Sequence, residues 1–460
     1  MSSDLLTIES ASRASTPPSA APGNLRRRAV SGAAWSGAGY AASQALRLAG
    51  NLILTRWLFP EAFGLIALVQ IFLQGLEMFS DMGVGPALVR DVRGAEPRFA
   101  NTAWSMQVTR GVALWLCALA AAAPLAWLYS EPLLAQLLPV AGFSAVLAGF
   151  AATDLFIASR KLNVRAVVLV EFGAQACGLV VMLAAAWLHP SVWALVWGGL
   201  ASSAAKTALS HLLVASQRNW FAWDREAALA LMGFGKWILA SSAVYFVSLQ
   251  LDRLLLGYFV APALLGVYTV AVLLAELPIA LNKRLTRQVL YPLLSAAHRE
   301  RPQALAADFA RGRRWLDLVF LPALGALMAL AQPVVDLLYD PRYAAAGWML
   351  SLLCLRTAMR CLLEPAETAL VALGAPRYAF WQHLVRLGWI ALALPLAWHE
   401  FGIQGLVTAA ALSEIPVLPV LWSGLARHGL LRPAIECRAI ALFAGSWLLV
   451  GALWRLGSGS

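Results

Sequence analysis

The sequence predicts an all-α polytopic membrane protein, in which two six-helix bundles related by a parallel repeat enclose a central cavity. Hydrophobic residues make up 60% of the 460 residues and charged residues only 13%, and the mean hydropathy is +0.70. A soluble domain averages about 45–50% apolar and about 25% charged residues. The apolar runs are also continuous over about 20 residues, as in spanning helices, instead of alternating as in a membrane barrel. A soluble enzyme, a fibrous protein and a disordered protein are therefore excluded.

Residues 1–28 are expected to form a disordered cytoplasmic tail, because the first 24 are rich in Ser, Ala and Pro and show no hydrophobic period. Arg26, Arg27 and Arg28 precede an apolar stretch of about 24 residues, which is too long for the core of a signal peptide and is followed by no small-residue cleavage site. This stretch is predicted to be an uncleaved first helix.

The apolar stretches together predict twelve core helices and a thirteenth near the C-terminus. Their ranges are 32–55, 62–84, 103–128, 136–158, 166–187, 192–214, 233–256, 264–282, 315–338, 345–371, 379–397, 404–424 and 439–456. The longest connection, 283–314, is basic and is expected to lie in the cytoplasm as a surface helix. Every connection is too short to hold a globular catalytic domain.

The distribution of basic residues supports this helix count and gives an orientation. With the N-terminus placed in the cytoplasm, inner segments hold 24 of the 35 Lys and Arg residues, outer segments hold 3, and the helices hold the rest. A wrong count would scramble this alternation, because basic residues concentrate in cytoplasmic loops. The C-terminus is then expected outside. The Ala- and Arg-rich composition suggests a bacterial inner membrane.

An internal repeat divides the chain into two lobes. At an offset of 202 residues the first helix pair matches the seventh and eighth helices, and the matching Trp, Pro and Gly residues mark the beginning of one helix and the turn that leads into the next. Six helices separate the copies, so both lobes face the same way. We expect an N-lobe over 29–220, a C-lobe over 221–428 and a C-terminal helix and tail over 429–460. The matching pairs are Trp35 and Trp237, Ala38 and Ala240, Ala41 and Ala243, Leu52 and Leu254, Leu54 and Leu256, Pro60 and Pro262, and Gly64 and Gly266.

Several segments carry a family resemblance. The basic start runs into AVSGAAW, followed by LTRWLFPEAFGLIAL (54–68) and DMGVGPALVR (81–90), and the second half contains LDRLLLGYFVAPALLGVYTVA (251–271). These segments resemble the polysaccharide-transport branch, with its Wzx-type and colanic-acid-type oligosaccharide flippases, of the multidrug/oligosaccharidyl-lipid/polysaccharide flippase superfamily. The resemblance covers about two thirds of the chain. It implies a polyprenyl-diphosphate-linked oligosaccharide as substrate and twelve or fourteen helices, from which a count of thirteen departs.

Two arginines are candidate substrate-binding residues, because a charge deep in a membrane indicates function, a buried pair or a side chain that reaches the surface. Arg47 lies about fifteen residues into the first helix, among small residues, too deep to reach the surface easily. Arg253 lies on the repeat-equivalent helix, where its counterpart Asn51 is one turn from Arg47. Arginine offers a fixed fork of donors that suits diphosphate oxygens. Pairing of Arg253 with the adjacent Asp252 is the alternative, although adjacent residues point in different directions.

The tenth helix carries a charged face, because Arg356, Arg360, Glu364 and Glu367 are spaced four, four and three residues apart. One interpretation is an internally satisfied ladder with Arg360 paired to Glu364. The other is a second wall of the transport path, in which Arg356 and Arg360 bind substrate. Pro365 predicts a kink there.

Acidic residues are candidates for ion coupling or gating, namely Asp81, Asp252, Glu364 and Glu414. Asp81 alternatively caps its helix or pairs with a nearby arginine. Glu414 precedes Pro416 and Pro419, which predict a broken helix whose freed carbonyls and carboxylate could hold a cation. Neither the five cysteines nor the six histidines show metal-ligand spacing, so no metal and no cofactor are expected.

The favoured function is translocation of the lipid-linked oligosaccharide from the cytoplasmic to the outer leaflet by alternating access, which requires no enzymatic step. A cation-coupled multidrug exporter of the same superfamily is the alternative, but it needs an anionic cavity, whereas the deepest charges here are cationic. A membrane O-antigen ligase needs a sizeable outer loop with catalytic side chains, and a scaffold would not need charge in mid-membrane. Expected partners are the substrate, the bilayer, H⁺ or Na⁺ as coupling ion, and the polymerase and glycosyltransferases of the pathway. Nucleic acid is not expected, because the net charge of +11 is explained by basic cytoplasmic loops.

Overall fold

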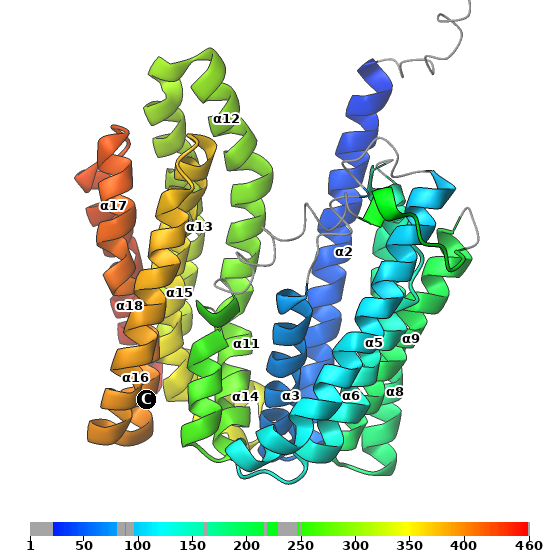
Figure 1. The fold of residues 1–460 in the computed structure, drawn as a ribbon. Coiled ribbons are helices and arrows are strands. Elements are labelled where there is room, and N and C mark those ends of the chain that lie inside the picture. Colours follow the sequence, from blue (N-terminus) through cyan, green and yellow to red (C-terminus); the bar gives the residue numbers. More distant parts are fainter. Residues whose placement is uncertain are drawn as a thin grey trace, which may run out of the picture.

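The computed structural model describes residues 22–80, 88, 96–160, 163–215, 219–228, 246–248 and 250–458, and within them it contains helices and no strand. The helices form two bundles that stand side by side (Figure 1). The N-lobe contains α2 (Pro22–Trp57), α3 (Pro60–Phe79), α5 (Pro97–Leu128), α6 (Leu134–Gly149), α7 (Asp154–Arg160), α8 (Val164–Leu188) and α9 (Val192–Leu213).

The C-lobe begins, in the described part of the chain, with helical residues 246–248 and 250–259. It continues through α11 (Pro262–Leu285), the π-turn η2 (Thr286–Leu290), α12 (Tyr291–Glu300), α13 (Leu305–Ala329), α14 (Ala331–Leu338), α15 (Ala346–Ala372), α16 (Arg377–Ala411), the 3₁₀ segment η5 (Leu412–Val417) and α17 (Leu418–Arg427). The last helix, α18 (Pro433–Ser458), packs against α13, where Ser446 Oγ donates to the Pro322 carbonyl at 2.7 Å.

Seven of the described helical stretches are long and apolar enough to span a membrane, and eight if α13 and α14, bent by 72°, form one broken span. One of the seven, Arg377–Arg427, folds back on itself at Gly402, whose φ is 57°. Trp389 Nε1 donates to the Ala409 carbonyl at 2.9 Å, whereas a straight helix would separate residues 20 positions apart by about 30 Å. The stretch is therefore a hairpin, as the two predicted helices 379–397 and 404–424 require, and the chain is a multi-pass α-helical membrane protein.

Several predicted boundaries need correction. The first helix begins at Pro22, so residues 22–28 of the predicted disordered tail are helical. The predicted helix 136–158 ends at Gly149, and α7 follows as a separate element. The predicted connection 283–314 is a hairpin in which α11 continues through η2 into α12 and α13 returns. This hairpin is stable as helix because Leu290, Leu294 and Phe309 are buried together in its core.

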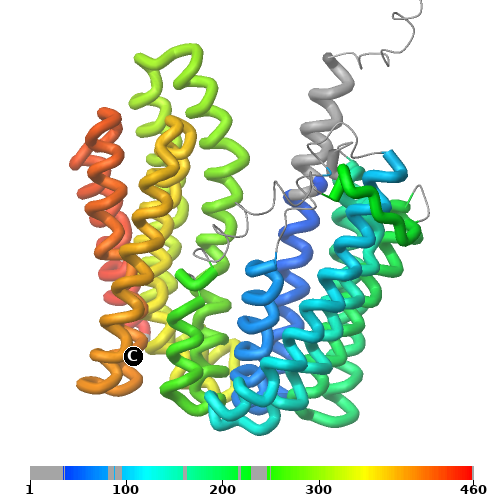
Figure 2. The backbone as a smooth tube through the Cα atoms, viewed as in Figure 1, coloured from blue at the N-terminus to red at the C-terminus, as the bar shows by residue number. Residues whose placement is uncertain are grey.

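The repeat brings its own matching residues into contact. Pro60 and Pro262 each occupy the first turn of α3 and α11, where proline suits the unpaired helix start. A Cβ on Gly64 would overlap the carbonyl oxygen of Pro262, and a Cβ on Gly266 would overlap that of Pro60. Such a reciprocal contact is the signature of a two-fold relation, so the two lobes meet backbone to backbone at the starts of α3 and α11, near the lower end of the view in Figure 2.

Polar contacts reinforce this meeting of the lobes. Between α14 and α15, Tyr339 Oη donates to Asn51 Oδ1 of α2 at 3.0 Å, and Arg342 Nη2 donates to the Arg56 carbonyl at 3.1 Å. Tyr343, fully buried, donates from its hydroxyl to the Leu58 carbonyl at 3.4 Å. Arg342 and Tyr343 thus satisfy backbone carbonyls that the end of α2 would otherwise leave unpaired. The C-lobe thus caps the first helix of the N-lobe at the end where positive-inside counting predicts the outer surface.

Candidate functional site

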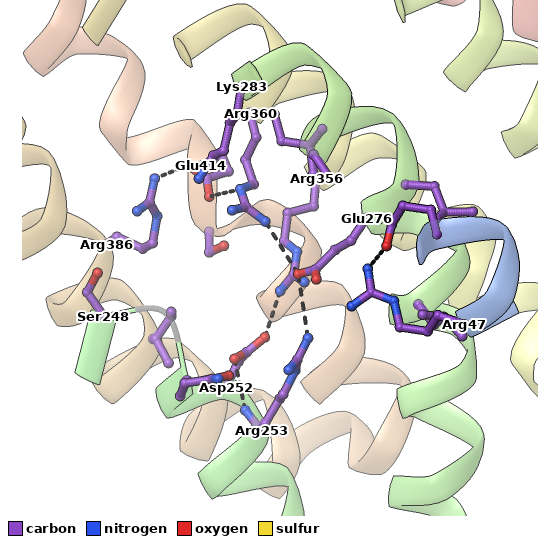
Figure 3. A pocket seen from close by; sticks show the side chains of 18 residues that line it. Arg47, Ser248, Asp252, Arg253, Glu276, Lys283, Arg356, Arg360, Arg386 and Glu414 are labelled. Carbon is purple, nitrogen blue, oxygen red and sulfur yellow. Dashed lines mark hydrogen bonds and ion pairs between the residues drawn. The ribbon is translucent and has the colours of Figure 1, made fainter. Parts of the chain in front are cut away.

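A cavity of about 300 Å³ lies between the lobes, and half of its lining residues are charged (Figure 3). The N-lobe contributes α2, and the C-lobe contributes the helix at 250–259, α11, α15, α16 and η5. All four predicted substrate-binding arginines line it, so residues more than 300 positions apart in the sequence converge here. The charged lining residues are Arg47, Arg253, Lys283, Arg356, Arg360 and Arg386, together with Asp252, Glu276 and Glu414.

Asp252 is the most fully satisfied of the acidic residues. Its side chain is buried and accepts from Arg356 Nη1 at 2.6 Å, from the Tyr268 hydroxyl at 3.2 Å and from the Arg253 backbone N–H at 2.9 Å. The side chain of Arg253 turns away and reaches Glu276 at 3.5 Å. The side chains of Asp252 and Arg253 therefore do not pair with each other, as expected for adjacent residues. The Asp252 carboxylate holds Arg356 instead.

The charged residues on one face of α15 form their ion pairs with other helices and not with one another. Arg360 contacts Glu276 at 3.6 Å and Glu414 at 3.9 Å. Glu364 lies beside Lys283 at 3.8 Å and Arg287 at 4.0 Å. The predicted ladder of Arg360 with Glu364 is therefore corrected, because each side chain finds an opposite charge on a neighbouring helix. The helix runs through Pro365 without ending.

Glu414 sits where the helix is broken, as predicted, in the 3₁₀ segment η5. Its Oε2 accepts from Arg386 Nη2 at 2.5 Å, and its Oε1 faces Arg360. Two guanidinium groups thus occupy the positions that a bound cation would take. The remaining coupling candidate, Asp81, lies outside the described residues.

Arg47 differs from the other arginines of the cavity. In the described part of the chain its hydrogen bond is to the neutral amide oxygen of Gln44, and no carboxylate lies within 4 Å of it. Lys283 is paired with Glu364 just outside the cavity. Six basic and three acidic residues line the cavity. Glu364 contacts Arg287 as well as Lys283, so this outside group adds no net negative charge, and the cavity keeps a surplus of three positive charges, one of them on Arg47.

Three charged residues of the site, Glu276, Lys283 and Arg386, are not among the predicted site residues. Each is an ionisable group inside an apolar stretch, which is the same signal that singled out Arg47. The place of Lys283, within about a turn of the predicted cytoplasmic helix end, favours a side chain that reaches the membrane surface, whereas Arg386, about two turns in, fits a surface position and a functional one equally. The fold turns both into the cavity. Depth along one helix therefore does not determine which way a side chain points.

A second cavity of about 390 Å³, here called the N-lobe chamber, adjoins the first. It lies among α2, α3, α8, α9 and α11, and its lining is predominantly apolar. Arg47 and Leu273 line both cavities. The charged cavity and the N-lobe chamber are therefore contiguous and share Arg47 at their junction.

Comparison with known proteins agrees with this architecture. The chain is 22% identical to the lipopolysaccharide biosynthesis protein WzxC of Escherichia coli over 76% of this chain and 71% of that protein. It is 26% identical to the succinoglycan biosynthesis transport protein ExoT of Rhizobium meliloti over 73% of this chain and 67% of that protein.

Among solved structures, the inward-facing conformation of a multidrug resistance MATE family transporter of the MOP superfamily shares the fold, with a TM-score of 0.67, 14% identity and coverage of 85% of this chain and 95% of that one. The model of one family, described as polysaccharide biosynthesis protein, matches residues 53–346. This match covers more than half of the chain, and the protein therefore belongs to the polysaccharide biosynthesis protein family.

Proposed function

We propose that the protein translocates a polyprenyl-diphosphate-linked oligosaccharide across the bacterial inner membrane, with its N-terminus in the cytoplasm. The observation that carries this proposal is the surplus of positive charge in the cavity between the lobes, with Arg47 free of any carboxylate partner in the described residues. A diphosphate diester carries two negative charges, and guanidinium groups bind phosphate oxygens through paired hydrogen bonds. Relatives named for polysaccharide transport support the same substrate class.

The site predicts how binding leads to movement. Arg47 belongs to the N-lobe, and the other basic residues of the cavity belong to the C-lobe. A diphosphate held by both would draw the lobes together around it, while the contact between α3 and α11 separates at the opposite end. The lobes then present the site to one side of the membrane at a time. Every step is binding or rigid-body motion, so no covalent chemistry is needed.

The charged network also offers a route for ion coupling. Glu414 holds both Arg386 and Arg360, so a proton on Glu414 would release two guanidinium groups toward the substrate. Asp252 and Glu364 neutralise Arg356 and Lys283 in the same way. Under this proposal, a Glu414→Gln variant binds the diphosphate without requiring a proton, and its transport rate loses its dependence on a pH gradient.

The competing functions fit the site less well. A cationic drug would meet a cavity with surplus positive charge. A ligase needs a sizeable outer catalytic loop, whereas the described connections at that end, such as 58–59, 129–133, 189–191 and 339–345, are two to seven residues long. The family relatives are named for biosynthesis and transport of polysaccharide.

Reconstitution in liposomes tests the proposal. A fluorescent polyprenyl-diphosphate oligosaccharide is placed in the vesicles, and its accessibility to an impermeant glycosidase is followed with and without a proton or sodium gradient. We expect fast equilibration with the wild type, a loss of at least tenfold in Arg47→Ala, and wild-type rates in the control Arg432→Ala, whose side chain is exposed outside the cavity. Equal slow rates for empty, wild-type and mutant vesicles under all gradients would refute the proposal.

A further inference from the structure

The N-lobe chamber is lined mostly by apolar side chains, and three of its six polar lining residues already have partners, Arg47, Gln70 and Ser202 being the others. Gln175 Nε2 donates to the Ser43 carbonyl at 2.9 Å, and Thr269 Oγ1 donates to the Leu265 carbonyl at 2.8 Å. Asn51 Oδ1 accepts from Tyr339 at 3.0 Å. A sugar ring in the chamber would find few partners for its many hydroxyl groups, and an unpaired buried polar group is unfavourable. The chamber therefore suits a hydrocarbon better than a glycan.

Glycines give the chamber its shape. A Cβ on Gly50 would overlap Leu179, and a Cβ on Gly178 would lie 2.6 Å from Ser202 Cβ and 2.8 Å from the Gly198 carbonyl oxygen. These glycines allow α2, α8 and α9 to pack closely around the space. Gly199 is different, because a Cβ there meets no atom within 4 Å although the residue lines the chamber. A side chain at position 199 would therefore enter the open chamber.

The position of the chamber relative to Arg47 identifies its ligand. In a polyprenyl diphosphate, the first isoprene unit is bonded directly to the phosphate that lies opposite the sugar. A group bonded to a phosphate at Arg47 can extend into the charged cavity or into the apolar chamber, since Arg47 lines both. The chamber volume of about 390 Å³ lies in the range of about 300–1,000 Å³ that is usual for small-molecule pockets.

We propose that the N-lobe chamber binds the first isoprene units of the lipid carrier, so that Arg47 holds the diphosphate at the boundary between an apolar site for the lipid and a polar site for the glycan. This inference rests on the proposed function and adds to it a recognition site for the carrier. It makes the protein selective for the lipid portion next to the diphosphate, independently of which sugar is attached.

Binding measurements on the full-length protein in nanodiscs test this site. The probes are methyl diphosphate, neryl diphosphate (two isoprene units) and glucosyl methyl diphosphate. Burial of two methylene-sized groups corresponds to about tenfold in affinity, so we expect neryl diphosphate to bind at least tenfold more tightly than methyl diphosphate. Gly199→Leu fills the chamber and should abolish this gain while leaving methyl diphosphate binding unchanged.

Gly388→Leu is the matched control, because Gly388 is also helical, a Cβ there would also meet no atom within 4 Å, and the residue lines neither cavity. Gly388→Leu should bind neryl diphosphate more tightly than methyl diphosphate, as the wild type does. Because the probes partition into lipid equally in both variants, a difference between Gly199→Leu and Gly388→Leu reports on the chamber. A gain that persists in Gly199→Leu, or a wild type that binds neryl and methyl diphosphate equally, overturns the chamber proposal alone. A gain for glucosyl methyl diphosphate that Gly199→Leu abolishes would assign the chamber to the glycan instead. Failure of the wild type to bind any of the three probes would refute the proposed function itself.

Discussion

Replacing Asp252 by Asn should separate the stability of the protein from its affinity for the diphosphate. Asp252 is 2% exposed and accepts from Arg356 at 2.6 Å, from Tyr268 and from the Arg253 backbone. Arg356 is itself 8% exposed, and its Nε already lacks a partner in the described structure. Removing the carboxylate leaves a buried guanidinium group without compensation, which typically costs about 3–5 kcal/mol.

Thermal unfolding of the protein in nanodiscs measures this effect. The entropy of unfolding scales with chain length and reaches about 1 kcal/mol per degree for 460 residues, so we expect Tm to fall by about 3–5 °C. The control Glu300→Gln, at an exposed position at the end of α12, should change stability by no more than about 0.5 kcal/mol. At the same time Asp252→Asn should bind methyl diphosphate more tightly, because Arg356 loses its internal counter-charge.

The double variant Asp252→Asn, Arg356→Gln decides whether the pair itself is responsible. Removing both charges should recover about half or more of the lost stability, since no uncompensated ion remains. A Tm of Asp252→Asn equal to that of the wild type would refute the reasoning. Losses in the two single variants that simply add in the double variant would refute it as well.

Three further predictions concern contacts outside the charged cavity. Gly64→Val should prevent the close crossing at Pro262 and increase the distance between spin labels placed at the starts of α3 and α11. An unchanged distance distribution would contradict the close backbone contact between the lobes at this point. Arg342→Gln removes a donor to the α2 carbonyls and should widen the same distance distribution to a smaller extent, without lowering methyl diphosphate affinity. Glu436→Gln breaks the buried bidentate pair with Arg313, and α18 should then become accessible to limited proteolysis at a temperature several degrees below that for the wild type; equal protease resistance would show that apolar packing alone holds α18.

Composition, apolar length and the spacing of basic residues were sufficient to predict an all-α multi-pass membrane protein, whereas the count of thirteen helices and the boundaries of the lobes stay predictions. Such features can be found from short stretches of sequence, because each spanning helix must satisfy its own backbone hydrogen bonds within the bilayer. The repeat was visible for the same reason, since Pro60 and Pro262 start equivalent helices. Helix ends were predicted less well, as at Pro22 and Gly149, because local propensity changes little across a boundary.

The sequence also singled out Arg47, Arg253, Arg356 and Arg360, because charge in an apolar stretch is conspicuous wherever it occurs. Only the tertiary structure decided their partners. Arg356 pairs with Asp252, 104 residues away, and Arg360 turns from its helical neighbour Glu364 toward α11 and η5. Spacing along one helix defines a face, but the charges that meet that face come from helices whose positions depend on packing of the whole bundle.

The packing of the whole bundle also decides which arginine lacks an acidic partner. That Arg47 lies deep in the membrane follows from its position in the first helix. That it lacks a carboxylate within the described structure, while its neighbours across the cavity have one, follows only from how the lobes face each other. The sequence determined which charges enter the membrane, and the tertiary structure decided which of them remain available to a substrate, because electrostatic compensation depends on distances of a few ångströms between helices far apart in the chain.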